Sequence, residues 1–198
     1  MKYLFEHQLF LSRYNLTLHG LWPEYYEGSY PQSCSTENFS EEVVQEIGLG
    51  RFELYWVNSK VKAGEEGYTS FWEHEWSKHG TCSGLEQYNY FDLTIDRIVA
   101  TPSIVSDNYG GSVQKEGLVD AYGGPSMATV VCESGKYLSE VRVCYGMEDD
   151  GTPTERIECP EHVLNEGNCG DEILIEKFYV DGYDRKFLRD AGNSVSST

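Results

Sequence analysis

FWEHEWSKHGTC, residues 71–82, is the segment that carries most information about this chain. We expect a helix over residues 68–80, ended by Gly80, because glycine is common directly after the last helical turn. At about 100° per residue, two histidines, a lysine and an acid of this segment fall within one arc of roughly 140°. These four residues are His74, Glu75, Lys78 and His79. One helix face is therefore expected to present two imidazoles, an ammonium group and a carboxylate.

Two aromatic residues of the same helix are expected to point in different directions. Phe71 falls inside the polar arc, whereas Trp76 falls outside it and is expected to anchor the helix in the core. Glu75 and His79 are four residues apart, which would let the carboxylate hold or polarise that imidazole. A run of charges is usually a solvated face, but this chain has only five histidines and 15 lysines and arginines. The cluster therefore favours a functional site.

A second segment, LTLHGLWPEYY at residues 16–26, carries another histidine. Residues 16–19 alternate in polarity and predict a short strand that runs into Gly20. His19 therefore stands at a strand end, and Trp22 follows in a loop rich in glycine, proline and aromatic residues. An exposed indole at Trp22 could stack on a nucleobase.

A zinc protease is the main alternative for the helical segment, because the segment contains a His-Glu pair. The zinc-protease motif places its two histidines four residues apart on one helix face. His74 and His79 are five residues apart, with Lys78 between them. A cation among metal ligands is unfavourable, and the six cysteines form no Cys-x-x-Cys pair of the kind that zinc sites use. We therefore expect no metal and no cofactor.

The two segments together hold the groups that RNA cleavage requires. A base takes the proton of the ribose 2′-hydroxyl, an acid gives a proton to the departing 5′-oxygen, and positive charge stabilises the negative charge on phosphorus. Two histidines and a lysine supply all three. Each proton transfer typically contributes about 10²–10⁴-fold to the rate, so single-stranded RNA is the expected substrate.

The formal net charge of −18 opposes nucleic-acid binding, which usually relies on a basic surface. We hypothesise that His19 and the helix face form a small cationic pocket and that the protein works in an acidic compartment. There the histidines gain charge, and many carboxylates lose theirs. Since one histidine must be neutral while the other is protonated, we expect a bell-shaped dependence of the rate on pH.

The rest of the chain predicts helices before strands. Helices are expected over residues 41–47, 90–100 and 112–124, and strands over residues 128–132, 138–146 and 178–180. The acidic segment 147–160 is expected to be a loop. This order of elements predicts an α+β domain with a central antiparallel sheet packed with several helices.

The chain is long enough for one domain. Residues 16–185 are assigned to that domain, residues 1–15 to an N-terminal extension and residues 186–198 to a flexible tail.

The two motif segments resemble the ribonuclease T2 family. HGLWP at residues 19–23 is similar to the family's first active-site segment, and FWEHEWSKHGTC at residues 71–82 is similar to its second. The resemblance extends more loosely from about residue 16 to residue 180. It implies a T2-like α+β fold and a metal-independent endoribonuclease that forms 2′,3′-cyclic phosphates and then 3′-phosphates.

The resemblance implies a role for each catalytic position that the motifs match. His79 resembles the general base, His19 the general acid and His74 a phosphate-binding residue. Glu75 and Lys78 resemble residues that stabilise the transition state.

Three further residues resemble substrate-binding residues of the family. Trp22 resembles a residue that stacks on a base, and Phe71 resembles one that lines the second base site. Glu24 stands where many members carry aspartate. Its carboxylate can still accept hydrogen bonds from a base, but the base preference does not follow from the resemblance.

Six cysteines indicate three disulfides and an oxidising compartment. Their spacing alone does not choose among the possible pairings. The resemblance implies the pairs Cys34–Cys82, Cys132–Cys169 and Cys144–Cys159. Asn15 and Asn38 begin N-x-[ST] triplets that could be glycosylated. We expect a secreted protein, or one in the lumen of a lysosome or vacuole, although no signal peptide is visible at the start of the chain.

Members of the family usually have an additional N-terminal strand with a Trp-Pro and Cys pattern, which residues 1–15 lack. We therefore expect this extension to be a truncated first strand that leaves a sheet edge open.

The alternative to an active enzyme is a catalytically weak or inactive protein that binds, stores or recognises a partner on the same fold. The presence of every catalytic residue of the two motifs favours the enzyme. We expect a monomer that binds single-stranded RNA and does not insert into a membrane.

Overall fold

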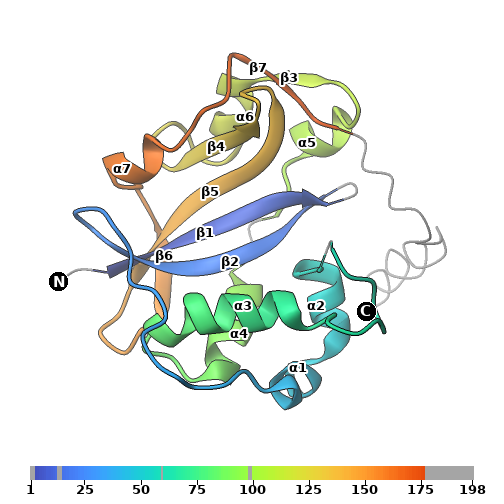
Figure 1. Cartoon of the computed structure of the whole chain (residues 1–198). Helices are drawn as coiled ribbons and strands as arrows, with labels where there is room; N and C mark the ends of the chain where they lie inside the picture. The colour runs from blue at the N-terminus through green and yellow to red at the C-terminus, as the bar shows by residue number, and fades with distance from the viewer. Residues whose placement is uncertain (1–2, 13–14, 59, 98–99, 177–198) are drawn as a thin grey trace, which may run out of the picture.

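The computed structural model describes residues 3–12, 15–58, 60–97 and 100–176 (Figure 1). Its described part contains a seven-stranded sheet with the order β2-β1-β5-β7-β3, in which β4 and β6 also pair with β5. The strands are β1 Tyr3–Ser12, β2 Asn15–Tyr25, β3 Ser112–Gln114, β4 Ala128–Glu133, β5 Tyr137–Met147, β6 Pro153–Ile157 and β7 Glu172–Leu174. β5 is the centre of the sheet, since it pairs with β1, β4, β6 and β7.

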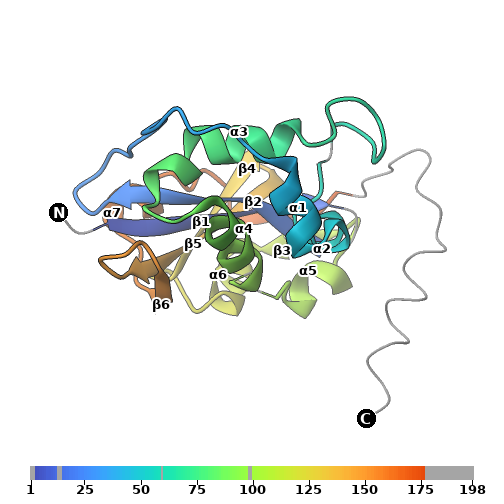
Figure 2. The ribbon, with the colours of Figure 1, turned by 90° about the horizontal axis from the view of Figure 1, so that it is seen from below.

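Helices lie on both sides of this sheet. They are α1 Glu41–Ile47, α2 Leu49–Tyr55, α3 Ser70–Lys78, α4 Gln87–Asp96, α5 Ser103–Asp107, α6 Lys115–Ala121 and α7 Glu161–Leu164, with a 3-10 turn at Gly80–Cys82. Helices α1 to α4 gather beside β2, whereas α6 and α7 lie by β4 (Figures 1 and 2). The predicted α+β class is confirmed. The sheet is antiparallel except for β5 and β7, which pair in parallel.

Three of the four tryptophans form the core between β2 and the first helices. Trp56, Trp72 and Trp76 are almost completely buried, which confirms that Trp76 anchors α3. The indole of Trp72 donates a hydrogen bond to the carbonyl oxygen of Trp56 at 2.8 Å. The indole of Trp56 in turn donates to the carbonyl oxygen of His19 at 2.8 Å. Buried rings thus fix the backbone of β2 at the residue that carries the first motif histidine.

Strand β2 contains a β-bulge at His19. Gln8 of β1 lies opposite Gly20. The next residue of β1, Leu9, lies opposite Leu18, so the register passes over His19. A bulge adds one residue to a strand and re-aims the side chains that follow it.

The bulge reverses the alternation of buried residues along β2. Leu18 and Leu21 are both fully buried, although three positions separate them. In a regular strand, residues three apart point to opposite faces. The added residue brings the ring of His19 against Trp22, with 5.1 Å between the ring centroids.

The prediction that residues 1–15 leave a sheet edge open is wrong. Tyr3–Ser12 forms β1, which lies between β2 and β5 inside the sheet. The first strand is therefore not residues 16–19, and the predicted open edge is filled by β1.

Two other sequence predictions differ from the structure. The predicted acidic loop 147–160 contains β6, which pairs with β5. The predicted helix 112–124 begins with the short strand β3 and becomes helical only at Lys115. The predicted strand 178–180 and tail 186–198 lie outside the described residues.

The structure contains the three expected disulfides, Cys34–Cys82, Cys132–Cys169 and Cys144–Cys159. Cys34–Cys82 fastens the long loop after β2 to the turn that follows α3. Two hydrogen bonds reinforce this link: the backbone N–H of Ser33 donates to the carbonyl oxygen of Lys78 at 2.8 Å, and the indole of Trp76 donates to the carbonyl oxygen of Glu37 at 3.2 Å. Among the described residues, no helix is both long and apolar enough to cross a membrane.

We expect the double change Cys34→Ser and Cys82→Ser to lower the free energy of unfolding. The bond closes a separation of 48 residues, for which the chain-entropy model gives a stabilisation of roughly 4 kcal/mol. Cys34 is exposed, so serine adds no buried polar group there. Urea titration measures the lost stability as a lower midpoint of two-state unfolding. Circular dichroism of the native variant is the control for retained secondary structure. An unchanged midpoint would show that the loop is held by its other contacts.

Candidate active site

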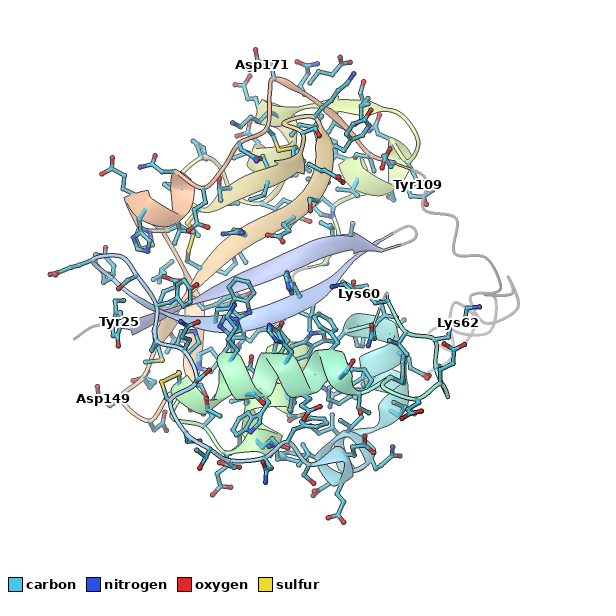
Figure 3. All side chains as sticks on the ribbon, in the orientation of Figure 1. Tyr25, Lys60, Lys62, Tyr109, Asp149 and Asp171 are labelled. Carbon is cyan, nitrogen blue, oxygen red and sulfur yellow. A yellow bond between two sulfur atoms is a disulfide. The ribbon has the colours of Figure 1, made fainter. Side chains whose placement is uncertain are left out.

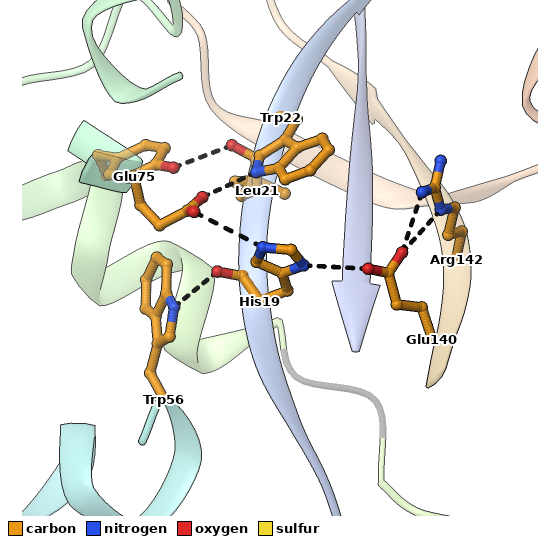
Figure 4. A network of polar contacts seen from close by, with 8 residues as sticks. His19, Leu21, Trp22, Trp56, Glu75, Glu140 and Arg142 are labelled. Carbon is orange, nitrogen blue, oxygen red and sulfur yellow. Dashed lines mark hydrogen bonds and ion pairs between the residues drawn. The ribbon is translucent and has the colours of Figure 1, made fainter. Parts of the chain in front are cut away.

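The two motif segments meet between β2 and α3. Side chains of both segments lie along this boundary between β2 and α3, which we call the seam. Tyr25 lies near one end of it and Lys60 near the other (Figure 3). The centre of the seam is drawn in Figure 4, where His19, Trp22 and Glu75 lie together. The structure thus brings the histidine of the first segment to the helix of the second, as the sequence predicted.

Glu75 is the most deeply buried acid of the site, with a relative exposure of 0%. The indole nitrogen of Trp22 donates a hydrogen bond to its Oε2 at 2.8 Å. Its Oε1 lies 3.8 Å from Nε2 of His19. Burial raises the pKa of Glu75 to about 7, despite the opposing effects of His19 and Trp22. The carboxyl group is therefore mostly protonated in acidic solution and ionised only toward alkaline pH.

His79 lies beneath Trp22. The two rings stack with 4.2 Å between centroids and 6° between planes, and His79 has a relative exposure of 0%. Neither ring nitrogen of His79 has a hydrogen-bond partner in the described part of the chain. Burial lowers the pKa of His79 to about 3, and the positive charge of Lys78 adds to this effect. The imidazole is therefore neutral at ordinary pH and has a lone pair to accept a proton.

The predicted support of His79 by Glu75 is wrong. The two are one turn apart on α3, and their backbones are joined by the helical bond from His79 N to Glu75 O at 3.0 Å. The Glu75 carboxylate instead turns toward Trp22 and His19. The indole N–H donor on β2 therefore determines the direction of the carboxylate.

His19 lies between two carboxylates. Its Nε2 faces Glu75, and its Nδ1 lies 3.4 Å from Oε1 of Glu140 on β5 (Figure 4). Phe71 closes another side, with 5.8 Å between ring centroids. The sequence analysis did not identify Glu140. An acid in a strand of ordinary alternation gives no signal until the register of β5 against β1 is known.

Cations and rings surround the outer edge of the site. Lys78 Nζ lies 5.8 Å from the ring centroid of Trp22 and 6.0 Å from that of Tyr30. Tyr30 is 47% exposed, and its ring centroid is 6.3 Å from that of His79. His74 is exposed on the same helix. Its pKa is lowered by partial burial and by the charge of Lys78.

The structure adds one residue to the predicted site and leaves the role of another open. Tyr30 was missed, because its loop was recognised only as rich in glycine, proline and rings. Glu24 was predicted to contact a base, but it has a relative exposure of 4% and lies 3.5 Å from Nε2 of His162. Its role in base binding stays a prediction. Within the described residues, no group of three or more His, Cys, Asp or Glu side chains could hold a metal ion.

Gly20 leaves the space in which Glu75 and Trp22 meet. A Cβ atom at this position would lie 2.3 Å from the indole nitrogen of Trp22 and closer still to Oε2 of Glu75. A side chain at this position would therefore separate the two groups.

Comparison with known proteins gives a consistent result. A model of the ribonuclease T2 family matches residues 6–159. The intracellular ribonuclease LX of Solanum lycopersicum is 27% identical in an alignment of 179 positions that covers 83% of this chain and 72% of the relative. The extracellular ribonuclease LE of the same plant is 27% identical in an alignment of 178 positions that covers 81% of this chain and 73% of the relative. The crystal structure of RNase NT with 5′-AMP has a TM-score of 0.65 at 23% identity, and covers 90% of this chain and 99% of its own.

We expect Glu75→Gln to stabilise the protein at neutral pH while it impairs the site. Because the folded-state pKa of about 7 exceeds the ordinary 4.5, the folded protein binds the proton more tightly than the unfolded chain. The stabilisation is present below about 4.5 and is lost as pH rises through about 7. Glutamine stays neutral and still accepts the hydrogen bond from the Trp22 indole. The variant therefore does not lose this stabilisation as pH rises.

Thermal unfolding of both proteins between pH 4 and pH 8 measures the effect. As pH rises, the melting temperature of the variant should increase relative to that of the wild type. Glu73→Gln is the matched control, since Glu73 is exposed on the same helix. Parallel curves for wild type and Glu75→Gln would contradict the raised pKa.

Proposed function

This chain belongs to the ribonuclease T2 family, and we propose that it cleaves single-stranded RNA by proton transfer between His19, His79 and the ribose phosphate. Cleavage would give a 2′,3′-cyclic phosphate, followed by hydrolysis to a 3′-phosphate. The observation that carries this proposal is the pairing of a neutral, buried imidazole at His79 with an imidazole at His19 that faces two carboxylates.

His79 is suited to act as the base. A general base must hold an available lone pair at the working pH, and the lowered pKa of about 3 keeps His79 neutral even in acidic solution. Because Trp22 covers the ring, the ribose 2′-hydroxyl would reach it only when the indole is displaced by the substrate. His79 would then accept the hydroxyl proton as the 2′-oxygen attacks phosphorus.

His19 is suited to act as the acid. Its two nitrogens face carboxyl groups on α3 and β5, and Glu140, the one whose pKa is lowered, supplies negative charge beside the ring in acidic solution. His19 would give its proton to the 5′-oxygen of the departing nucleotide. In the hydrolysis step His19 would take a proton from the attacking water, and His79 would return its proton to the 2′-oxygen as the cyclic phosphate opens.

The remaining side chains of the site suit an anionic substrate. Lys78 supplies a positive charge beside the two imidazoles, and His74 lies one turn away on the same helix. Glu75 is mostly neutral below its pKa of about 7, so in acid it repels phosphate little. The local charge is therefore more favourable to RNA than the net charge of −18 indicates.

Aromatic side chains offer surfaces for the bases. Tyr30 and Trp22 flank Lys78, and Phe71 packs beside His19. Stacking on such rings is worth about 1–3 kcal/mol per base and tolerates different bases. These rings would hold the nucleotides on either side of the scissile phosphate.

We also propose that the protein works in an acidic, oxidising compartment, either outside the cell or in a lysosome or vacuole. Three disulfides and the low pKa of the base support this assignment. One relative is named an intracellular ribonuclease and another an extracellular ribonuclease, so family membership does not choose between the two locations. An inactive binding or storage protein is less well supported, because every motif residue that the chemistry needs is present at the site.

The reaction is tested by incubating the purified protein with a short single-stranded RNA in excess chelator. We expect 2′,3′-cyclic phosphate ends first and 3′-phosphate ends later, resolved by mass spectrometry. His79→Ala and His19→Ala should each reduce cleavage on the order of 10²–10⁴-fold, the usual worth of a proton-transfer group. Ser77→Ala, an exposed change on α3, should cleave like the wild type. Full activity of His79→Ala would overturn the proposal.

The pH profile of kcat/KM is a separate test. Protonation of His79 removes the base, so the acidic limb should fall only as pH approaches about 3. Because the reaction also needs a protonated acid, the rate should fall again toward alkaline pH, which gives a bell-shaped profile. A rate that climbs steadily into alkaline pH would show that no protonated acid is needed.

A further inference from the structure

We propose that Glu140 is a positioning residue for the general acid, and that it holds the proton of His19 Nδ1 so that Nε2 exchanges protons with the substrate. This inference rests on the function proposed above. It adds a residue from β5 that lies outside both motif segments.

The geometry of His19 separates the tasks of its two nitrogens. Nδ1 lies 3.4 Å from Oε1 of Glu140, and Nε2 lies 3.8 Å from Oε1 of Glu75 (Figure 4). A carboxylate at one nitrogen of an imidazole fixes the tautomer and the ring orientation. When His19 gives its Nε2 proton to the 5′-oxygen, it becomes the neutral tautomer that keeps the proton on Nδ1. Its Nε2 lone pair is then ready to accept a proton from water in the second step.

Glu140 is itself held in place. Its Oε2 accepts hydrogen bonds from Nε and Nη2 of Arg142 at 3.1 and 2.9 Å. Residues two apart on a strand share a face, so these two side chains can meet without distorting β5. Arg142 also forms an ion pair with Glu166 on its other side. A chain of contacts therefore runs from Glu166 through Arg142 and Glu140 to His19.

The sheet brings these residues together across a strand. In the register of β1 with its neighbours, Phe10 lies opposite Glu140 on one side and Thr17 on the other. Glu140 therefore lies two strands from β2, with β1 between them, and the bulge at His19 turns the imidazole toward it. This juxtaposition depends on β1 lying between β2 and β5.

The two carboxylates beside His19 differ in their charge at acidic pH. Burial raises the pKa of Glu75 to about 7. Burial also acts to raise the pKa of Glu140, but its contacts with His19 and Arg142 outweigh this effect and lower it below the ordinary value. At pH 5, Glu140 is thus the ionised partner of His19, whereas Glu75 is mostly neutral. Among the described residues, His74 and His79 also interact electrostatically with the ring of His19.

Glu140→Gln tests the proposal, since glutamine keeps the size of the side chain and removes its charge. We expect kcat to fall on the order of 10- to 100-fold, below the roughly 10²–10⁴-fold worth of the proton transfer itself, with little change in KM. The alkaline limb of the pH profile should move to lower pH, because the protonated ring loses its charged partner. Glu140→Asp should recover part of the rate.

A substrate with an activated leaving group separates positioning from a general structural role. A nucleoside 3′-(p-nitrophenyl phosphate) expels nitrophenolate without protonation, so it bypasses the acid but still needs the base. On this substrate Glu140→Gln and His19→Ala should approach the wild type, whereas His79→Ala should stay impaired. Equal losses on both substrates would overturn the proposal.

Glu133→Gln is the matched control, since Glu133 is an exposed acid on the neighbouring strand β4. It should leave kcat and the pH profile close to those of the wild type. If Glu140→Gln keeps full kcat while His19→Ala is impaired, the positioning role is wrong and the proposed function stands. If neither His19→Ala nor His79→Ala is impaired, the proposed function itself is wrong.

Discussion

The burial of the Glu75 carboxyl group between α3 and β2 is the constraint on which the site depends. A buried carboxylate loses its hydration, and among the described residues the indole N–H of Trp22 and the ring of His19 lie against it. These contacts join the helix of the second motif to the strand of the first. The same contacts place Trp22 over His79. One buried acid thus fixes the relative position of both imidazoles.

Local patterns in the sequence predicted the residues of the site but not their mutual contacts. The helical spacing of residues 74–79 placed the histidines, the lysine and the acid on α3, and the structure confirms that helix. Spacing says nothing about which side of a helix faces a neighbour, so the direction of Glu75 was predicted wrongly. Trp22, 53 positions away, supplies the donor that settles it.

Non-local pairing explains most of what the sequence did not predict. The segment that forms β1 lacks the Trp-Pro and Cys pattern of the family's first strand, so it was interpreted as a truncated extension. Glu140 could not be assigned to the site until β1 was known to separate β5 from β2. The disulfide pairs were correct because the family resemblance supplied them. Their spacing alone would have left the choice open.

The bulge at His19 has a consequence for how this segment of the chain can evolve. Strand residues alternate between the two faces of a sheet, so the single extra residue determines to which face every later side chain of β2 points. Loss of one codon between Leu18 and Trp22 would turn the indole into the apolar interior and expose a leucine. Homologous genes should therefore tolerate exchanges of amino acids in this segment far better than changes in its length.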